Sequence, residues 1–229
     1  MFRSMALKEL REVRVIAVVA MIIYGIITIA AIDPRSPLNL FNYLGMSGSR
    51  IDSIPFVQDN FVGKFYFFAA LVAIAFGLWQ TFGETVRGTY PFLLHRPASR
   101  RWLMGMKLFV GSAVYLIATA VPLLIYSFWA ATPGNHASPF EWSMTVSSWV
   151  AWSAMTIIYF GAFLTGIMPG RWYQSRFLPL AAAIFAVFVV VATANSGLNG
   201  SLWPCWIILA VDVWIITMIF FVAQSHDYT

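Results

Sequence analysis

Long apolar runs separated by short polar stretches make up most of this chain of 229 residues. At 1.5 Å per residue, about 20 apolar residues are enough to cross the hydrocarbon core of a bilayer. The pattern therefore predicts an all-α integral membrane protein, with residues 1–229 forming a single transmembrane domain of six helices. The six spans are expected at about residues 13–32, 61–82, 103–129, 146–168, 177–194 and 204–223.

The first twelve residues have a different pattern. Apolar and polar positions alternate there at spacings of three and four, which is typical of an amphipathic helix. Together with its basic residues, this predicts an interfacial helix, residues 1–12, lying along the membrane surface before the first span. The apolar run that follows is longer than the core of a signal peptide, so we expect it to be retained as a span. The expected apolar face contains Phe2, Met5, Ala6, Leu10 and Val13, and the polar face contains Arg3, Lys8, Arg11 and Glu12.

The composition agrees with a membrane protein, since 60% of the residues are hydrophobic and only 10% are charged. The net charge of +5 does not indicate a nucleic-acid partner, because the basic residues lie at the ends of apolar runs instead of forming a stripe. Cytoplasmic loops are enriched in Lys and Arg. If the six spans alternate, one side has eleven of these residues and the other has Arg35, Arg50 and Lys64. Both termini are therefore expected in the cytoplasm.

Residues for chemistry are sparse. The three histidines, His95, His136 and His226, have no metal-ligand spacing, and the chain has no Gly-rich phosphate loop followed by Lys and Ser or Thr. We therefore expect no catalytic residues, no metal and no cofactor in this chain. The one cysteine, Cys205, is interpreted as a small packing residue.

The acidic residue deepest in a predicted span is Asp212. An ionisable group inside a membrane is costly and suggests a function. The sequence offers this carboxyl no obvious basic partner in another span. A packing or hydrogen-bonding role and a role in translocation both stay open.

The most polar run is GETVRGTYPFLLHRPASRRW, residues 83–102, between the second and third predicted spans. Gly83 and Gly88 indicate breaks, Thr89 can cap a short helix through YPFLLHR, and Ser99 can cap the helix that follows. A short cytoplasmic helix that exposes apolar side chains is suited to docking a soluble partner. The residues expected in this docking site are Glu84, Arg87, Gly88, Thr89, Phe92, Leu93, Leu94, Arg96, Pro97, Ser99, Arg100 and Arg101.

The segment FGETVRGTYPFLLHRPASRRWLMGMKLFVG resembles the signature of ABC-2-type transporter permeases. In that family an acidic residue and Gly-Thr precede an LL…P(V/A)SR segment and a Lys that opens the third span. The matching residues here are Glu84, Gly88, Thr89, Leu93, Leu94, Pro97, Ala98, Ser99, Arg100 and Lys107.

This resemblance implies a permease subunit of an ABC transporter in the plasma (bacterial inner) membrane. The helix around Thr89 to Arg96 would be the coupling helix that docks a separate ATPase subunit, which would bind ATP and Mg. The permease would pair with itself or with a paralogue. Export of a hydrophobic or amphipathic cargo (a peptide, lipid or drug-like molecule) is the expected activity.

Three other readings are weaker. A non-transporting subunit that uses the same movement mechanically, or anchors an assembly, would share the coupling helix. An ion-coupled secondary carrier usually needs several polar groups and broken helices near the midplane, and here Asp212 alone stands out. An intramembrane enzyme lacks a catalytic set.

Overall fold

The fold is taken from a computed structural model, which describes residues 2–32, 54–57, 60–86, 99–135, 140–168, 175–195 and 203–225. In these ranges the secondary structure is helical apart from turns. The α-helices are α1 (Phe2–Ile32), α3 (Asn60–Val86), α5 (Arg100–Ala131), α6 (Val146–Ile167), α7 (Leu178–Asn195) and α8 (Trp203–Ser225), with a 3-10 helix, η1 (Trp142–Thr145), before α6.

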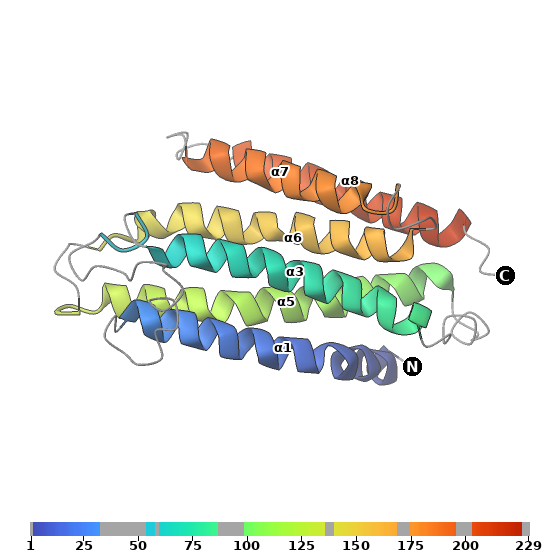
Figure 1. Ribbon diagram of the computed structural model, residues 1–229, viewed down its shortest axis with the longest axis horizontal. Helices are drawn as coiled ribbons and strands as arrows, with labels where there is room; N and C mark the ends of the chain where they lie inside the picture. The colour runs from blue at the N-terminus through green and yellow to red at the C-terminus, as the bar shows by residue number, and fades with distance from the viewer. Residues whose placement is uncertain are drawn as a thin grey trace.

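The α-helices run side by side along the long axis and alternate in direction (Figure 1). Both chain ends lie at the same end of the bundle, which we call the terminal end. Helix α3 finishes at the terminal end and α5 starts there. The end of α3 and the start of α5, which flank the most polar part of the sequence, therefore lie at the same end of the bundle as the start of α1.

Five helical segments of the described chain are long and apolar enough to cross a membrane. The fifth predicted span, residues 177–194, corresponds to α7, whose apolar described part, Leu178–Thr193, is shorter than the other five segments. That α7 also crosses stays a prediction. The five segments are Met5–Ile32, Phe61–Thr81, Arg101–Ala131, Trp142–Ile167 and Trp203–Gln224.

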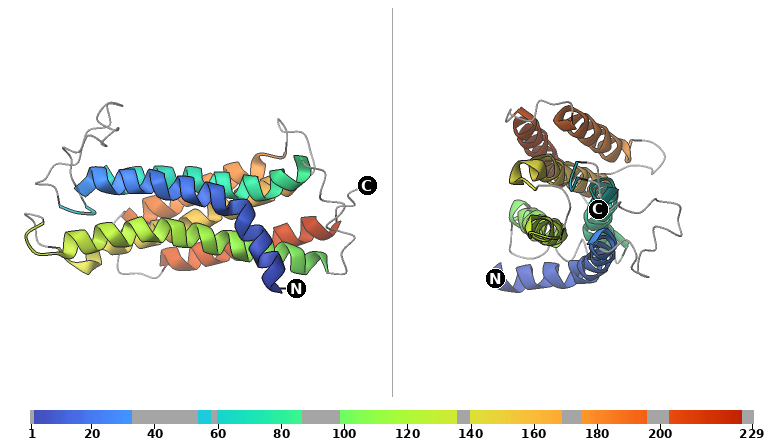
Figure 2. Two further views of the ribbon diagram at one scale, coloured as in Figure 1. Left: turned by 90° about the horizontal axis from the view of Figure 1, so that it is seen from below. Right: turned by 90° about the vertical axis from the view of Figure 1, so that its left-hand side faces the viewer.

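Helix α1 is continuous, so the expected boundary between an interfacial helix and a span is not a break in the helix. It is a bend instead: the first turns of α1 run across the bundle axis before the helix turns along it (Figure 2). Of the residues expected on the apolar face, Met5 and Val13 are buried against the bundle and Leu10 is exposed on its surface. The buried position between Met5 and Val13 is occupied by the carboxylate of Glu9.

Helix α6 is the centre of the bundle, and it is buried along its length from Ala154 to Ile167. Small residues bring its neighbours close, as expected for helices packing within a membrane. Gly77 of α3 lies against the backbone of Tyr159, and Gly161 of α6 lies against Ala183 of α7. Gly166 of α6 lies against the side chain of Thr81. Small residues at positions 161 and 166 of the sequence are suited to such close helix contacts, and the structure has both contacts.

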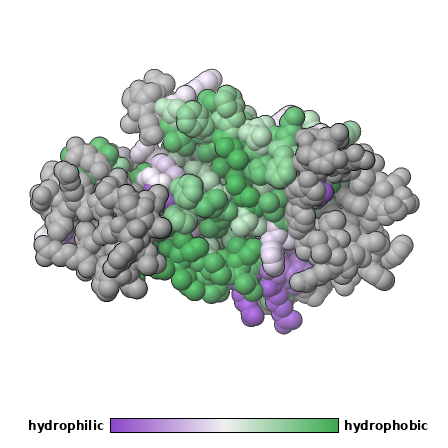
Figure 3. Space-filling view, viewed as in Figure 1, coloured by the Kyte–Doolittle hydropathy of each residue, from purple (hydrophilic) through white to green (hydrophobic). Residues whose placement is uncertain are grey.

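The outside of the bundle is apolar along its middle. Figure 3 shows hydrophobic side chains covering the described surface between the two ends. A water-soluble protein rarely exposes such a continuous apolar surface. The described helices therefore have the surface of an integral membrane protein. Large exposed side chains include Phe109, Ile117 and Phe128 of α5, Phe185 and Phe188 of α7, and Trp206, Val213 and Phe221 of α8.

Two glycines of α3 provide a test of this packing. A methyl group on Gly77 would overlap the backbone of Tyr159 and Phe163, whereas one on Gly63 would meet nothing within 4 Å. We expect Gly77→Ala to lower the free energy of unfolding by about 1–3 kcal/mol through overpacking. Gly63→Ala should be neutral or stabilising, because Ala favours a helix over Gly by about 1 kcal/mol. Thermal unfolding in detergent would measure both, and equal effects of the two changes would contradict the α3–α6 contact.

Candidate functional site

Most of the predicted docking site lies outside the described residues. Glu84 belongs to α3 and Arg100 to α5, but only their backbones are described. Ser99 and Arg101 are described completely. The predicted site residues outside the described ranges are Arg87, Gly88, Thr89, Phe92, Leu93, Leu94, Arg96 and Pro97.

The start of α5 agrees with the sequence. Ser99 has an extended backbone, with φ −62° and ψ 141°, and its Oγ accepts a hydrogen bond from the backbone N of Trp102 at 3.3 Å. This confirms Ser99 as the N-cap. Arg101 then donates from Nη2 to Oε1 of Gln224 at 2.7 Å, which joins the first turn of α5 to the last turns of α8. The beginning of α5 is thus fixed both by its cap and by a contact with α8.

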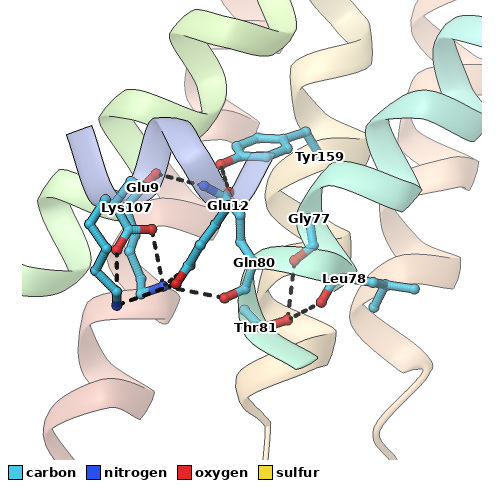
Figure 4. A network of polar contacts seen from close by, with 9 residues as sticks. Glu9, Glu12, Gly77, Leu78, Gln80, Thr81, Lys107 and Tyr159 are labelled. Carbon is cyan, nitrogen blue, oxygen red and sulfur yellow. Dashed lines mark hydrogen bonds and ion pairs between the residues drawn. The ribbon is translucent and has the colours of Figure 1, made fainter. Parts of the chain in front are cut away.

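Two turns further along α5, the ammonium group of Lys107 is buried among four helices (Figure 4). Its Nζ donates to Oε2 of Glu9 at 3.1 Å and to the backbone oxygen of Gln80 at 3.3 Å. Oε2 of Glu12 lies 3.8 Å from the same Nζ. The residue Lys107 is 3% exposed and Glu9 is 0% exposed. A buried charge requires such close partners, because removing an ammonium group from water is expensive.

The contacts continue from Lys107 to α6. The side-chain amide of Gln80 donates to the backbone oxygen of Lys107 at 3.3 Å, and its Oε1 accepts from the hydroxyl of Tyr159 at 2.6 Å. Gly111 leaves room for this pair, since a Cβ there would collide with both Gln80 and Tyr159. We call Glu9, Glu12, Gln80, Lys107 and Tyr159 the Lys107 network. It links α1, α5, α3 and α6 in one chain of contacts.

The formal charges in and around the Lys107 network balance. Lys8 lies 3.5 Å from Glu12 and 3.7 Å from Oε1 of Glu9, so two carboxylates face two ammonium groups. Oε1 of Glu9 is nevertheless buried without a hydrogen bond. This arrangement is suited to holding the helices in position. It does not resemble a catalytic site, because its lysine is paired with carboxylates and the network has no nucleophile beside a base.

Sequence reasoning missed this network. In the sequence analysis Lys107 was one of the basic residues that indicate membrane orientation and one of the residues that match the family signature. Glu9 had no assigned role. A signal was present, because Glu9 lies four residues after Met5 and four before Val13, on the expected apolar face. A carboxylate at that position indicates either a polar partner inside the protein or a break in the helix.

Asp212 of α8 faces α6. Its Oδ2 accepts a hydrogen bond from the hydroxyl of Thr156 at 2.6 Å, and its Oδ1 is buried without a partner. Among the described residues, no basic group forms an ion pair with it. The geometry therefore provides a contact between α6 and α8, which fits the packing role that the sequence left open, and the translocation role stays untested.

Two further expectations concern the surface and metals. Cys205 is exposed, so its interpretation as a packing residue is wrong: it lies on the outward side of the first turn of α8. Within the part of the chain that the structure describes, no three His, Cys, Asp or Glu side chains come close enough to hold a metal ion.

An apolar groove of about 340 Å³ lies among α6, α7 and α8. It begins near the end of α6 and the start of α7, and it follows the second half of α8. Its walls present almost no polar atoms, so it fits hydrocarbon better than a polar ligand. Residues that line it include Leu164, Met168, Pro179, Ala182, Trp214 and Met218.

Comparisons of this chain with models of protein families, with curated proteins and with solved structures give no match.

The Lys107 network predicts a large effect of removing one charge. Lys107→Met leaves Glu9 buried without its ammonium partner, and we expect it to lower the free energy of unfolding by about 3–5 kcal/mol. The double change Lys107→Met with Glu9→Met should recover most of that loss, because no buried charge remains. Arg14→Met, the loss of an exposed charge on α1, is the control and should change it by less than about 0.5 kcal/mol. Unfolding in detergent would measure all three, and a double variant as unstable as the single one would contradict the pairing.

Asp212 predicts a smaller effect. Asp212→Asn keeps an acceptor for Thr156, so stability should be nearly unchanged, whereas Thr156→Val removes the donor. Hydrogen bonds between helices in membranes contribute about 0.6–1.7 kcal/mol, and a double-mutant cycle between Thr156→Val and Asp212→Leu should give a coupling in this range. Thr217→Val is the control, because the Thr217 hydroxyl bonds only to its own helix, at the oxygen of Val213. A coupling of zero would show that the contact carries no stability.

Proposed function

We propose that this chain is the permease subunit of an ABC-2-type transporter, with six spans and with both termini in the cytoplasm of a bacterial inner membrane. The observation that carries the proposal is the place of the motif in the bundle. The residues that resemble the family signature connect α3 to α5, and both helices meet at the terminal end (Figure 1). A partner that docks there would also face the transverse first turns of α1 (Figure 2).

Six crossings are supported by the positions of the chain ends. An odd number of crossings would leave the termini on opposite sides, and they lie at the same end. Helix α7 has 18 residues. That length corresponds to about 27 Å, close to the roughly 30 Å of a bilayer core. We therefore count α7 as the fifth span. The excess of Lys and Arg in the terminal segments and in the connections on the same side supports a cytoplasmic position for that side.

The transverse start of α1 serves as the interfacial helix in this proposal. Leu7 and Leu10 are 56% and 44% exposed, and Arg11 and Arg14 are exposed beside them. Apolar side chains next to guanidinium groups suit the boundary between acyl chains and lipid headgroups.

ATP hydrolysis belongs to a partner in this proposal, because the sequence has no phosphate-binding loop. A separate ATPase subunit would bind ATP and Mg and would dock on the coupling helix between α3 and α5. The permease would form a homodimer or a heterodimer with another permease. The apolar groove among α6, α7 and α8 supports a hydrophobic or amphipathic cargo, and export is the direction that we propose.

The test is co-expression with an ATP-binding subunit encoded beside this chain, followed by purification through a tag on the permease. A stable complex that hydrolyses ATP would support the proposal. A permease that purifies alone under conditions where the ATPase subunit is folded and abundant would overturn it.

The docking site itself is tested by Phe92→Asp and Leu93→Asp. A carboxylate in an apolar docking surface should weaken binding of the ATPase subunit about thirtyfold or more, since buried contacts of this kind contribute about 2 kcal/mol or more. Val57→Asp is the control, because Val57 is an exposed apolar residue, 63% accessible, outside the long helices. Membrane insertion should be normal for all three variants. Unchanged co-purification of the Phe92 and Leu93 variants would remove the coupling helix from the proposal.

A further inference from the structure

The Lys107 network lies on the route from the proposed docking segment to the first span, so this inference rests on the proposed function. Lys107 follows the N-cap Ser99 by eight residues, about 12 Å along a rigid helix. Helix α5 is continuous from Arg100 to Ala131. A displacement of the segment before Ser99 would therefore reach Lys107 through the helix without loss.

On the other side of the contact is the transverse part of α1. Residues around the ion pair are apolar and buried, namely Met5, Val13, Met104 and Leu108. Apolar burial is non-directional, whereas an ion pair requires its two charged groups to be close, so it favours one register of the two helices. The Lys107 contacts therefore decide which turn of α1 lies over α5.

Lys107 has two carboxylates within reach, and they are not equivalent. Glu9 accepts its hydrogen bond at 3.1 Å, whereas Glu12 lies 3.8 Å away and is paired with Lys8 at 3.5 Å. Glu9 and Glu12 are three residues apart, about 4.5 Å along α1. A small shift of α1 along its own axis, across α5, would exchange the partners: Lys107 would hold Glu12, and the side chain of Lys8 would turn to Glu9 on its own helix. Lys8 already lies 3.7 Å from Glu9, so both pairs of the second register are nearly formed.

We propose that Lys107 is a positioning residue that exchanges Glu9 for Glu12 when the docked ATPase moves α5, and that this exchange moves the first span. The exchange conserves charge, because two ammonium groups and two carboxylates are paired in each register. Neither register leaves a buried charge alone, which is the condition for two states of similar free energy. Gln80 keeps its bond to the backbone oxygen of Lys107, so α3 moves together with α5 in this step.

A purely structural ion pair and a partner exchange differ in what Glu12 does. If Lys107 serves only to hold Glu9, the partly exposed Glu12 is dispensable. If the partner exchanges, Glu9→Gln and Glu12→Gln remove one register each, although both changes delete one carboxylate from the same helix.

The first measurement uses the chain alone in detergent and needs no ATPase. In the Glu9→Gln background, Lys107→Met should still lower the unfolding midpoint by a few degrees, about 2–4 °C for each kcal/mol in a chain of this size. In the Glu9→Gln, Glu12→Gln background the same change should have a clearly smaller effect. Equal effects in the two backgrounds would mean that Glu12 does not replace Glu9, and the exchange would be excluded whatever the chain binds.

The second measurement uses the complex with the ATP-binding subunit in vesicles. Glu12→Gln should reduce its ATP turnover at least about fivefold, the lower range of coupling between sites. Unfolding midpoint and ATPase binding should stay those of the parent chain. Arg11→Gln, an exposed change of charge on the same turn, is the control and should leave turnover unchanged.

The outcomes separate the two proposals. Normal ATP turnover by the Glu12→Gln complex, with the ATPase bound, would overturn the proposal that Lys107 exchanges Glu9 for Glu12 during the ATPase cycle. A parent chain that binds no ATPase overturns the proposed function, and the unfolding measurement still decides whether Lys107 can exchange its partner.

Discussion

An ammonium group buried in an apolar bundle persists only while oxygen atoms surround it, and this condition organises the terminal end of the molecule. The oxygens around Lys107 come from α1 and α3, and Gln80 extends the contacts to Tyr159 of α6. No single helix could supply them. Glu9 of α1 accepts the hydrogen bond of the ammonium group, and the glycine at position 111 leaves room for the amide and the phenol. The polar contacts thus help to fix the relative positions of four helices. Further along the bundle, the hydroxyl of Tyr115 on α5 donates to the backbone oxygen of Ala69 on α3, and Trp152 of α6 donates to the hydroxyl of Thr119 on α5.

The rest of the bundle depends on close packing around α6. Glycines at 77, 161 and 166 allow backbones to approach, which matters in a membrane because the lipid chains compete equally well for apolar side chains. Asp212 is also an ionisable residue within a helix, but it has fewer polar partners than Lys107: one hydroxyl of α6 donates to one of its two carboxylate oxygens. The two ionisable groups differ in their surroundings, since Lys107 has paired carboxylates within 4 Å and Asp212 has a single neutral donor among the contacts described.

Much of the fold could be predicted from the sequence, because the period and length of apolar runs are local properties. The five long helices and the N-cap at Ser99 follow from such patterns. The Lys107 network could not, because it depends on which helices are neighbours. Leu10 was assigned to the apolar face of the first helix and Glu9 to neither face. In the bundle Leu10 is exposed on the apolar outer surface, whereas Glu9 is buried, because its ammonium partner lies inside. Cys205, interpreted as a packing residue, is likewise exposed on the outside of α8.

The separation of Glu9 and Lys107 in the chain also has a consequence for biosynthesis. The two partners are 98 residues apart. At about 5–20 residues per second, the ribosome needs roughly 5–20 seconds to make that stretch. During this time the first helix has left the ribosome with a carboxylate whose partner does not yet exist. The N-terminal turns therefore have a reason to remain at the membrane surface, where water solvates Glu9, until α5 arrives. The order of synthesis makes docking of the first helix a late event in the assembly of this protein.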